Sequence, residues 1–148
     1  MHWNGKDSAV FQAQKEYIDT AVIPLTLIDG SEYGFQFAAS AADFILSLSN
    51  TVENQFRGRI VLFPSFSYTK GQDKQSLIES WKEELKKAEF KHIFFLTSDK
   101  EWSTMGEEEN VMWIPSIPLE SMDPKMKNSV LEDQLRQLIP IFAKKWAN

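Results

Sequence analysis

Four short apolar stretches along the chain have the composition of buried strands. They are rich in valine, isoleucine, leucine and phenylalanine on consecutive positions, which is typical of strands that are covered on both faces. They span residues 20–28, 59–66, 91–97 and 111–115. Pro24 lies inside the first stretch and has no N–H for a strand ladder, so it predicts an edge position, a bulge or an early end to pairing.

Between these stretches the apolar residues recur every three or four positions, as they do on one face of a helix. The predicted helices span residues 7–18, 35–54, 73–88 and 124–146. Residues 98–110 are polar and are predicted to form a loop with room for one helical turn. The apolar face of the second helix consists of Phe37, Ala41, Phe44, Ile45, Leu48 and Val52.

Capping residues and prolines mark features of the first and last helices. Asp7 or Ser8 can cap the first helix by accepting its free N–H groups. Asp123 followed by Pro124 is a strong start signal for the last helix. Pro140 is expected to kink that helix, because it removes a backbone hydrogen bond and crowds the preceding turn.

The order of these elements indicates the fold class. Buried strands that alternate with amphipathic helices favour a largely parallel sheet with helices on both faces. We therefore predict an α/β fold, a three-layer α/β/α sandwich of Rossmann-like type with a mostly parallel four-stranded sheet. The length of 148 residues is typical of one domain, spanning residues 1–148.

Composition and charge exclude several classes of protein. Sixteen basic against twenty-one acidic residues give a net charge of −5, which argues against a nucleic-acid binder. The chain has no cysteine, so disulfides, thiolate catalysis and zinc–thiolate sites are excluded. No apolar run reaches the ~18 residues of a membrane span, and no secretory signal opens the chain, so an integral membrane protein is not expected.

Candidate site residues follow from the predicted sheet, because ligands of open parallel sheets bind beyond the carboxyl ends of the strands. Two interpretations of this edge stay open: the prolines and hydroxyls that follow the strands are ordinary turn residues, or they belong to a polar pocket of hydroxyls and carboxylates. The candidates are Thr26, Asp29, Ser31, Glu32, Ser65, Ser98, Asp99 and Ser116.

The familiar catalytic and cofactor motifs are absent from the sequence. There is no GxxxxGK[ST] phosphate loop and no GxSxG elbow, and the turn after the first strand has only Gly30 and Gly34 of a dinucleotide loop. His2 lies at a terminus expected to be mobile, and His92 lies near the amino end of a strand. Oxygen ligands for magnesium or calcium exist at the predicted edge, but their spacing does not favour a site, so no metal and no cofactor is predicted.

The chain resembles the YpiF-like proteins, a small family of unknown function in endospore-forming Firmicutes. The resemblance rests on the opening MHWNGKDS and on the segments KEYIDTAVIPL and VLFPSFSY. It implies a cytoplasmic protein of a Gram-positive bacterium, with a protein partner linked to a menaquinol–cytochrome c reductase. The family has no assigned activity, cofactor or catalytic residue, so the resemblance implies none here.

A second resemblance is to the creatininase-type amidohydrolases. The segment TAVIPLTLIDGSEYG is similar to their first strand and metal loop, and KKAEFKHIFFLTSD is similar to the helix and strand before their NGHGGN loop. Glu32 matches the metal glutamate of that family only with a gap, and the histidine that should follow it is missing. The resemblance therefore implies a shortened relative that has lost its dinuclear metal site.

Two hypotheses about function follow from these observations. The first is a non-catalytic binding or accessory module that contacts a protein partner or a small ligand at the carboxyl edge of the sheet. The alternative is a small, degenerate creatininase-like hydrolase that uses Asp29, Glu32, Asp99 and nearby serines, which requires these carboxylates to converge with at least one raised pKa. The first is favoured, since no histidine, cysteine or phosphate loop lies where catalysis needs one.

Overall fold

A parallel β-sheet forms the centre of the protein, whose structure is a computed structural model that describes residues 1–147. The sheet has the order β2-β1-β4-β5, and β3 also pairs with β1. The sequence predicted four strands, and the structure has five. They are β1 (Thr20–Leu27), β2 (Ile60–Leu62), β3 (Phe66–Tyr68), β4 (His92–Thr97) and β5 (Val111–Trp113).

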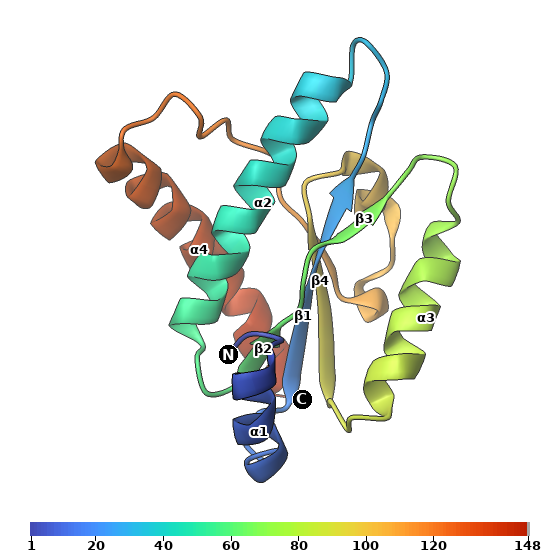
Figure 1. Cartoon of the computed structure of the whole chain (residues 1–148), viewed down its shortest axis with the longest axis vertical. Helices are drawn as coiled ribbons and strands as arrows, with labels where there is room; N and C mark the ends of the chain where they lie inside the picture. The colour runs from blue at the N-terminus through green and yellow to red at the C-terminus, as the bar shows by residue number, and fades with distance from the viewer. Residues whose placement is uncertain (148) are drawn as a thin grey trace.

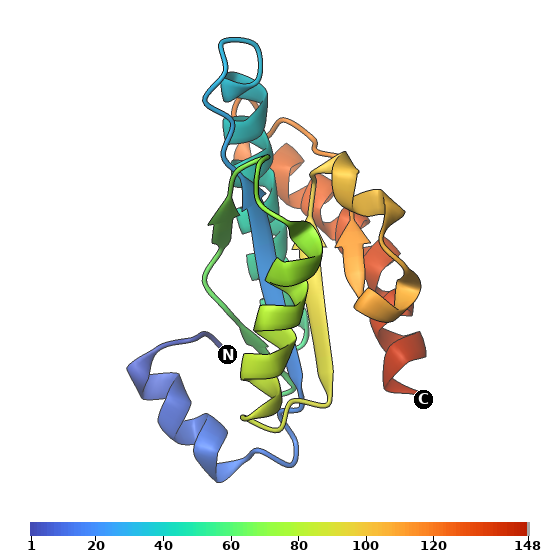
Figure 2. The same cartoon turned by 90° about the vertical axis from the view of Figure 1, so that its right-hand side faces the viewer.

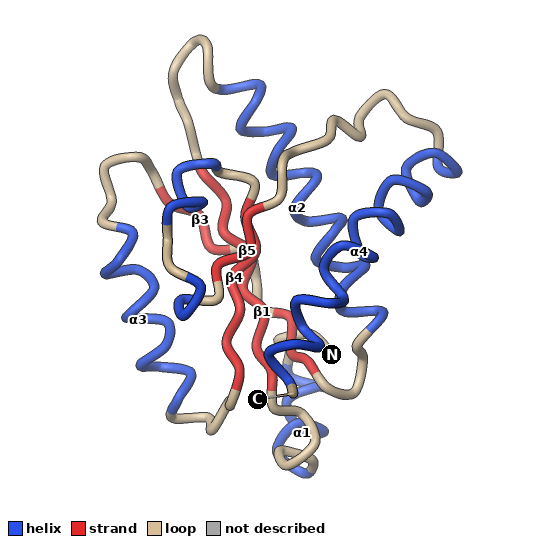
Figure 3. Tube along the Cα trace, turned by 180° about the vertical axis from the view of Figure 1, so that it is seen from behind, coloured by secondary structure: helices blue, strands red, loops and turns tan. Residues whose placement is uncertain are grey.

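Helices cover both faces of the sheet, which confirms the three-layer α/β/α prediction. Figure 3 shows the strands as a central layer, with α2 and α4 on one side and α3 on the other. The α-helices are α1 (Gly5–Ala13), α2 (Phe35–Gln55), α3 (Lys74–Lys86) and α4 (Pro124–Trp146). Two short 3₁₀ helices, η1 (Lys100–Thr104) and η2 (Glu107–Glu109), replace the predicted loop between β4 and β5.

The core is divided by the sheet into two apolar clusters, as the continuous apolar strands require. Alternate residues of β1 show the division: Val22 packs with Phe44 and Leu48 of α2, whereas Ile23 packs with Ile78 of α3. Within residues 1–147, no helix is long and apolar enough to cross a bilayer.

The predicted second strand is broken into β2 and β3 on the same side of β1. Thr20 of β1 lies opposite Ile60, and Leu25 lies opposite Phe66, so the neighbouring chain has one extra residue between these two pairs. The N–H of Thr20 and the carbonyl of Val22 bond to this neighbour, so by alternation Pro24 faces it as well. Pro24, which has no N–H to donate, therefore lies opposite the interruption between β2 and β3. The predicted bulge is confirmed, and the predicted edge position is wrong, because β1 is paired on both sides.

The amino-terminal segment is held in place, contrary to the expected mobility of His2. Leu62 donates its N–H to the carbonyl of Met1, and Trp3 donates its N–H to the carbonyl of Leu62. Next to this bridge, α1 begins at Gly5 and not at residue 7. Asn4 is its cap in place of Asp7 or Ser8, because its side chain accepts the N–H of Asp7 at 2.7 Å.

A buried carboxylate ties the same segment to α2. Glu53 is only 2% exposed and lies 2.8 Å from the Met1 ammonium. It also accepts two hydrogen bonds from Arg57 at 3.1 Å and lies 3.2 Å from Nε2 of His2. Burial by itself would raise the pKa of Glu53, but the hydrogen bonds from Arg57 and the ammonium, with the charge of the ammonium, lower it to about 2.

At the other end of the chain, α4 continues through Pro140 as one helix and ends against the sheet. Trp146 donates its indole N–H to the Thr20 hydroxyl at 2.8 Å, and the guanidinium of Arg59 lies 4.1 Å from the centroid of the Trp146 ring. Arg59 in turn bonds Asp19, which precedes β1. Residues near both ends of the chain therefore contact the amino edge of the sheet, whereas the carboxyl edge is surrounded by loops (Figure 1).

Candidate functional site

The connections of the sheet place a crevice between β1 and β4. The chain leaves β1 through α2 and reaches β2 on one side, and it leaves β3 through α3 and reaches β4 on the other side. The loop after β1 leads to α2 on one face of the sheet. The loop after β4 leads to η1, whose Trp102 belongs to the apolar cluster on the other face with Ile78 of α3, so the two loops diverge at this point (Figure 2). Such a topological switch point is where open α/β sheets bind ligands.

A groove of about 420 Å³ occupies this switch point. Of the candidate residues, the groove is lined by Thr26, Asp29, Ser98, Asp99 and Ser116. The structure places the other three outside the groove. Ser31 donates its N–H to the Asp29 carboxylate, and Glu32 is exposed on the same loop. Ser65 lies between β2 and β3, and its hydroxyl is hydrogen-bonded to the Thr26 hydroxyl at 2.6 Å. The volume lies within the ~300–1,000 Å³ range of small-molecule sites.

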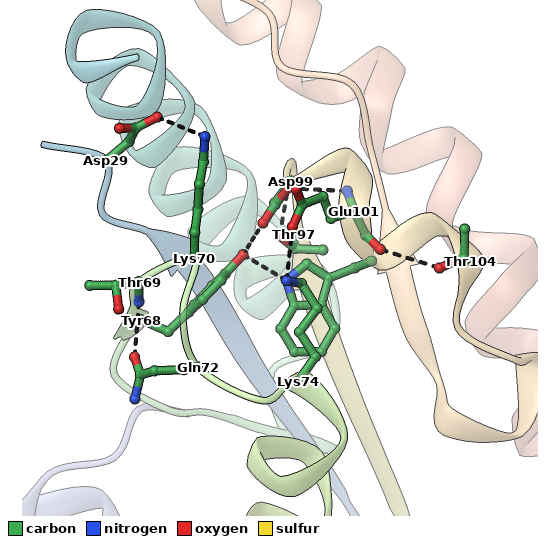
Figure 4. Close-up of polar contacts among 11 residues, drawn as sticks. Asp29, Tyr68, Thr69, Lys70, Gln72, Lys74, Thr97, Asp99, Glu101 and Thr104 are labelled. Carbon is green, nitrogen blue, oxygen red and sulfur yellow. Dashed lines mark hydrogen bonds and ion pairs between the residues drawn. The ribbon is translucent and has the colours of Figure 1, made fainter. Parts of the chain in front are cut away.

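Asp29 is held at the beginning of α2. Its carboxylate accepts the N–H of Ser31 at 2.9 Å and lies 3.3 Å from the ammonium of Lys70 (Figure 4). The Ser31 hydrogen bonds, aided by Lys70, lower the pKa of Asp29. The carboxylate also packs directly against Gly34, the cap residue of α2. A negative charge there complements the helix dipole, so Asp29 occupies the position that a phosphate would otherwise take.

Replacing Gly34 by alanine is expected to displace the Asp29 carboxylate. A Cβ on Gly34 would overlap it, whereas the backbone of Gly34 (φ −99°) accepts alanine without strain. Loss of the Ser31 contact should raise the pKa of Asp29 towards its ordinary value, which NMR titration of the carboxyl carbons measures. Gly30→Ala is the control, because a Cβ there meets nothing within 4 Å. An unchanged Asp29 pKa in Gly34→Ala would contradict this account of the turn.

Asp99 is oriented by a buried aromatic pair that joins β3 to η1. The Tyr68 hydroxyl donates to the Asp99 carboxylate at 2.5 Å and accepts the indole N–H of Trp102 at 2.6 Å (Figure 4). Tyr68 and Trp102 are each 1% exposed. Burial, followed by the Asp99 hydrogen bond, raises the pKa of Tyr68, so the phenol stays protonated and donates. The second Asp99 oxygen accepts the N–H of Glu101 at 3.1 Å.

Ser98 supplies a hydroxyl without a partner. Its Oγ is buried, and among the described residues it makes no hydrogen bond. The carbonyl of the same residue accepts the indole N–H of Trp113 at 3.3 Å, which fixes the Trp113 ring on the other wall of the groove. A buried hydroxyl without a partner costs free energy unless a ligand or water satisfies it, so Ser98 indicates a contact point.

Two ion pairs neutralise most of the charge around the groove. Lys70 pairs with Asp29, and Lys74 pairs with Glu101 at 3.0 Å. Among the described side chains, no three histidines or carboxylates come together as a metal site, so the carboxylates of Asp29, Glu32 and Asp99 do not form one. The arrangement is suited to holding a molecule by hydrogen bonds and apolar contact.

Several groove residues were not found from the sequence. Phe37 was assigned to the core face of its helix, but it is 69% exposed and lines the groove. Tyr68 lies beyond the predicted strand 59–66, and Trp102 lies in the polar segment 98–110 that was predicted to be a loop. Neither has a local signal, because their partners become neighbours only when β3, β4 and η1 assemble. Trp113 was correctly placed in a strand, but its contact with the groove depends on the strand order.

Comparison with known proteins gives two matches. The profile of a family described as "Protein of unknown function (DUF2487)" matches residues 9–146. The uncharacterized protein YpiF of Bacillus subtilis (strain 168) is 29% identical over 150 residues, which cover 99% of this chain and 99% of that protein. No solved structure matches. These findings bear out the resemblance to YpiF-like proteins and do not support the resemblance to creatininase-type amidohydrolases.

Proposed function

The chain belongs to a family of unknown function, DUF2487, and we propose that it is a non-catalytic binding module that holds a small ligand in the groove between β1 and β4. The observation that carries the proposal is the buried Ser98 hydroxyl, which lacks a partner among the described residues and lies in a groove at the topological switch point.

The lining of the groove indicates the kind of ligand. Phe37 and Ala41 of α2 and Trp113 of β5 supply an apolar wall, while Thr26 and Ser98 supply hydroxyls at the strand ends. A few polar groups among apolar side chains are typical of sites for small organic molecules. Phosphate ligands are disfavoured, since the Asp29 carboxylate already occupies the beginning of α2.

The hydrolase alternative receives less support from the same geometry. A carboxyl group that works as a general acid near neutral pH needs a raised pKa. The pKa of Asp29 is lowered instead, and Asp29 and Asp99 are held by separate sets of partners. These contacts favour fixed charge and hydrogen bonding over proton transfer.

The proposal is tested by amide NMR spectra recorded with small aromatic and alicyclic alcohols, amines and carboxylates, with inorganic phosphate and ATP for comparison. We expect one or more of the organic compounds to shift the amide signals of Ser98 and Ser116, and phosphate and ATP to leave them unchanged. The proposal is wrong if no compound shifts these signals, or if all shifts fall on other surfaces.

Ser98→Ala is expected to separate ligand binding from stability. Loss of one hydrogen bond should weaken the binding of tryptophol, an aromatic alcohol, by about fivefold. The free energy of unfolding should stay the same or rise, because a buried hydroxyl without a partner is removed. Ser49→Ala is the matched control: its hydroxyl in α2 is also buried without a described partner, but it lies outside the groove. Equal tryptophol affinity in all three proteins would contradict the role of Ser98.

A protein partner at the same edge is the second candidate function. The loop after β1 projects beyond the sheet in both Figure 1 and Figure 2. Ile28 and Tyr33 are exposed on it, and Phe35 is exposed at the first position of α2. A partner there would broaden the amide signals of Tyr33 and Phe35, which lie outside the groove lining, whereas a groove ligand shifts those of Ser98 and Ser116. The link to a menaquinol–cytochrome c reductase, the cytoplasmic location, the absence of nucleic-acid binding and the single domain stay predictions.

A further inference from the structure

One carboxylate of the groove has no cationic partner among the described residues. Asp29 and Glu101 are paired with lysines, whereas the described partners of Asp99 are the uncharged Tyr68 hydroxyl and the Glu101 N–H. Lys100 also lines the groove, and no ion pair joins it to Asp99 in the described part of the chain. The groove therefore presents a half-buried negative charge that a bound cation would neutralise.

Asp99 is also prepared to receive a donor. A carboxylate offers about four acceptor positions, and two of them are occupied here. Tyr68 and Trp102 are buried and hydrogen-bonded to each other, so they hold the carboxylate plane in one orientation. Because the rotation of the Asp99 carboxylate is already restricted, a ligand that donates a hydrogen bond to it does not have to immobilise it, which favours binding.

The opposite wall suits an apolar body beside a positive charge. Phe37 and Trp113 place two aromatic side chains in the groove lining, and Ala38, Ala41 and Ile45 of α2 add apolar surface to it. The Trp113 ring is fixed through its hydrogen bond to the Ser98 carbonyl. Aromatic faces attract organic cations, so this wall and Asp99 favour the same ligand class.

We propose that the groove binds a small organic amine, with its ammonium donating to Asp99 and its apolar ring or chain lying along Phe37 and Trp113. This inference rests on the proposed function and specifies the ligand class of the same site. An anionic ligand of equal size in the same position is disfavoured, because its charge would meet Asp99, which forms no ion pair among the described residues.

The test compares three molecules that share an indole ring and differ in the charge of their end group: tryptamine, tryptophol and indolepropionate. Their dissociation constants for the full chain are measured from shifts of groove amide signals. Tryptamine should bind about tenfold more tightly than tryptophol, as expected for a hydrogen bond to a charged group, and indolepropionate should bind most weakly. High salt should reduce the advantage of tryptamine.

Asp99→Asn should remove most of the tryptamine advantage and leave tryptophol binding nearly unchanged, since the amide oxygen still accepts from Tyr68. Asp133→Asn is the matched control, because it removes an equal charge from an exposed carboxylate on α4. If Asp99→Asn does not fold, the comparison of the three molecules on the wild-type protein still tests the amine proposal.

The outcomes separate the two proposals. If tryptamine and tryptophol shift the groove signals with equal affinity, or if Asp99→Asn keeps the full tryptamine advantage, the amine inference is overturned and the groove remains a ligand site. If none of the three molecules shifts the groove signals, the amine inference fails, and the ligand site fails with it only if no compound of the wider panel shifts them.

Discussion

Replacing Glu53 by glutamine is expected to lower the free energy of unfolding by about 3 kcal/mol at neutral pH. The substitution keeps the shape of the side chain and removes its charge, so the ammonium of Met1, a residue whose side chain is 10% exposed, loses its counter-ion. The pKa of Glu53, lowered from an ordinary 4.5 to about 2 in the folded protein, leads to the same magnitude. Urea denaturation of protein with a free amino terminus measures the difference.

The same substitution has a defined pH dependence. Because the pKa of Glu53 is lower in the folded than in the unfolded state, its stabilisation is fully present above about pH 4.5 and is lost as the pH falls towards 2. The difference between wild type and Glu53→Gln should therefore shrink in acid. Glu84→Gln is the control: Glu84 pairs with Lys87 on the open surface of α3, and its loss should change stability by less than ~0.5 kcal/mol. A Glu53→Gln difference that does not vary with pH would contradict the ion-pair account.

The sequence was sufficient to predict the helices, the strands and the three layers, because all of these depend on the local hydrophobic pattern. Continuous apolar runs became strands covered on both faces, and the period of three to four residues became helices. What the pattern missed was the break between β2 and β3. The run 59–66 was predicted to be one strand although it contains Pro64. The interruption falls at Pro64 and opposite Pro24 of the neighbouring strand, and neither proline has an N–H to offer.

Phe37 shows where helical periodicity stops being informative. It lies on the same face as Phe44 and Leu48, which pack on the sheet, but it is about two turns before Phe44 and three turns before Leu48 in α2. At that level the sheet has ended, so the same face looks over the carboxyl edge. The apolar side chain that was predicted to belong to the core therefore becomes part of the groove wall.

The polar clusters could not be predicted, because their members come from distant parts of the chain. Glu53 is buried by the first residues of the chain, which add to the edge of the sheet beside Leu62. Asp99 could be named from the rule for strand ends, but its partners Tyr68 and Trp102 depend on β3 lying beside β1. Strand direction determines at which edge of the sheet the site lies, and strand order determines which side chains meet there.

Tyr68→Phe is expected to lower the free energy of unfolding by about 2–4 kcal/mol. The substitution removes one hydroxyl and keeps the ring, so packing changes little. The indole N–H of Trp102, which is 1% exposed, would then have no acceptor, and water cannot reach it. Asp99 would lose the hydrogen bond that orients its carboxylate, so tryptamine should also bind less tightly.

A double-mutant cycle separates the hydrogen bond from packing. Trp102→Phe removes the orphaned donor, so the double variant should be less destabilised than the sum of the two single variants by about 1–3 kcal/mol. Tyr17→Phe is the control, because the Tyr17 ring is largely exposed and its hydroxyl can bond water. If Tyr68→Phe unfolds at the same urea concentration as Tyr17→Phe, the aromatic pair does not support Asp99. If the cycle shows no coupling, the loss in Tyr68→Phe comes from the hydrogen bond to Asp99 and not from the unpaired indole N–H of Trp102.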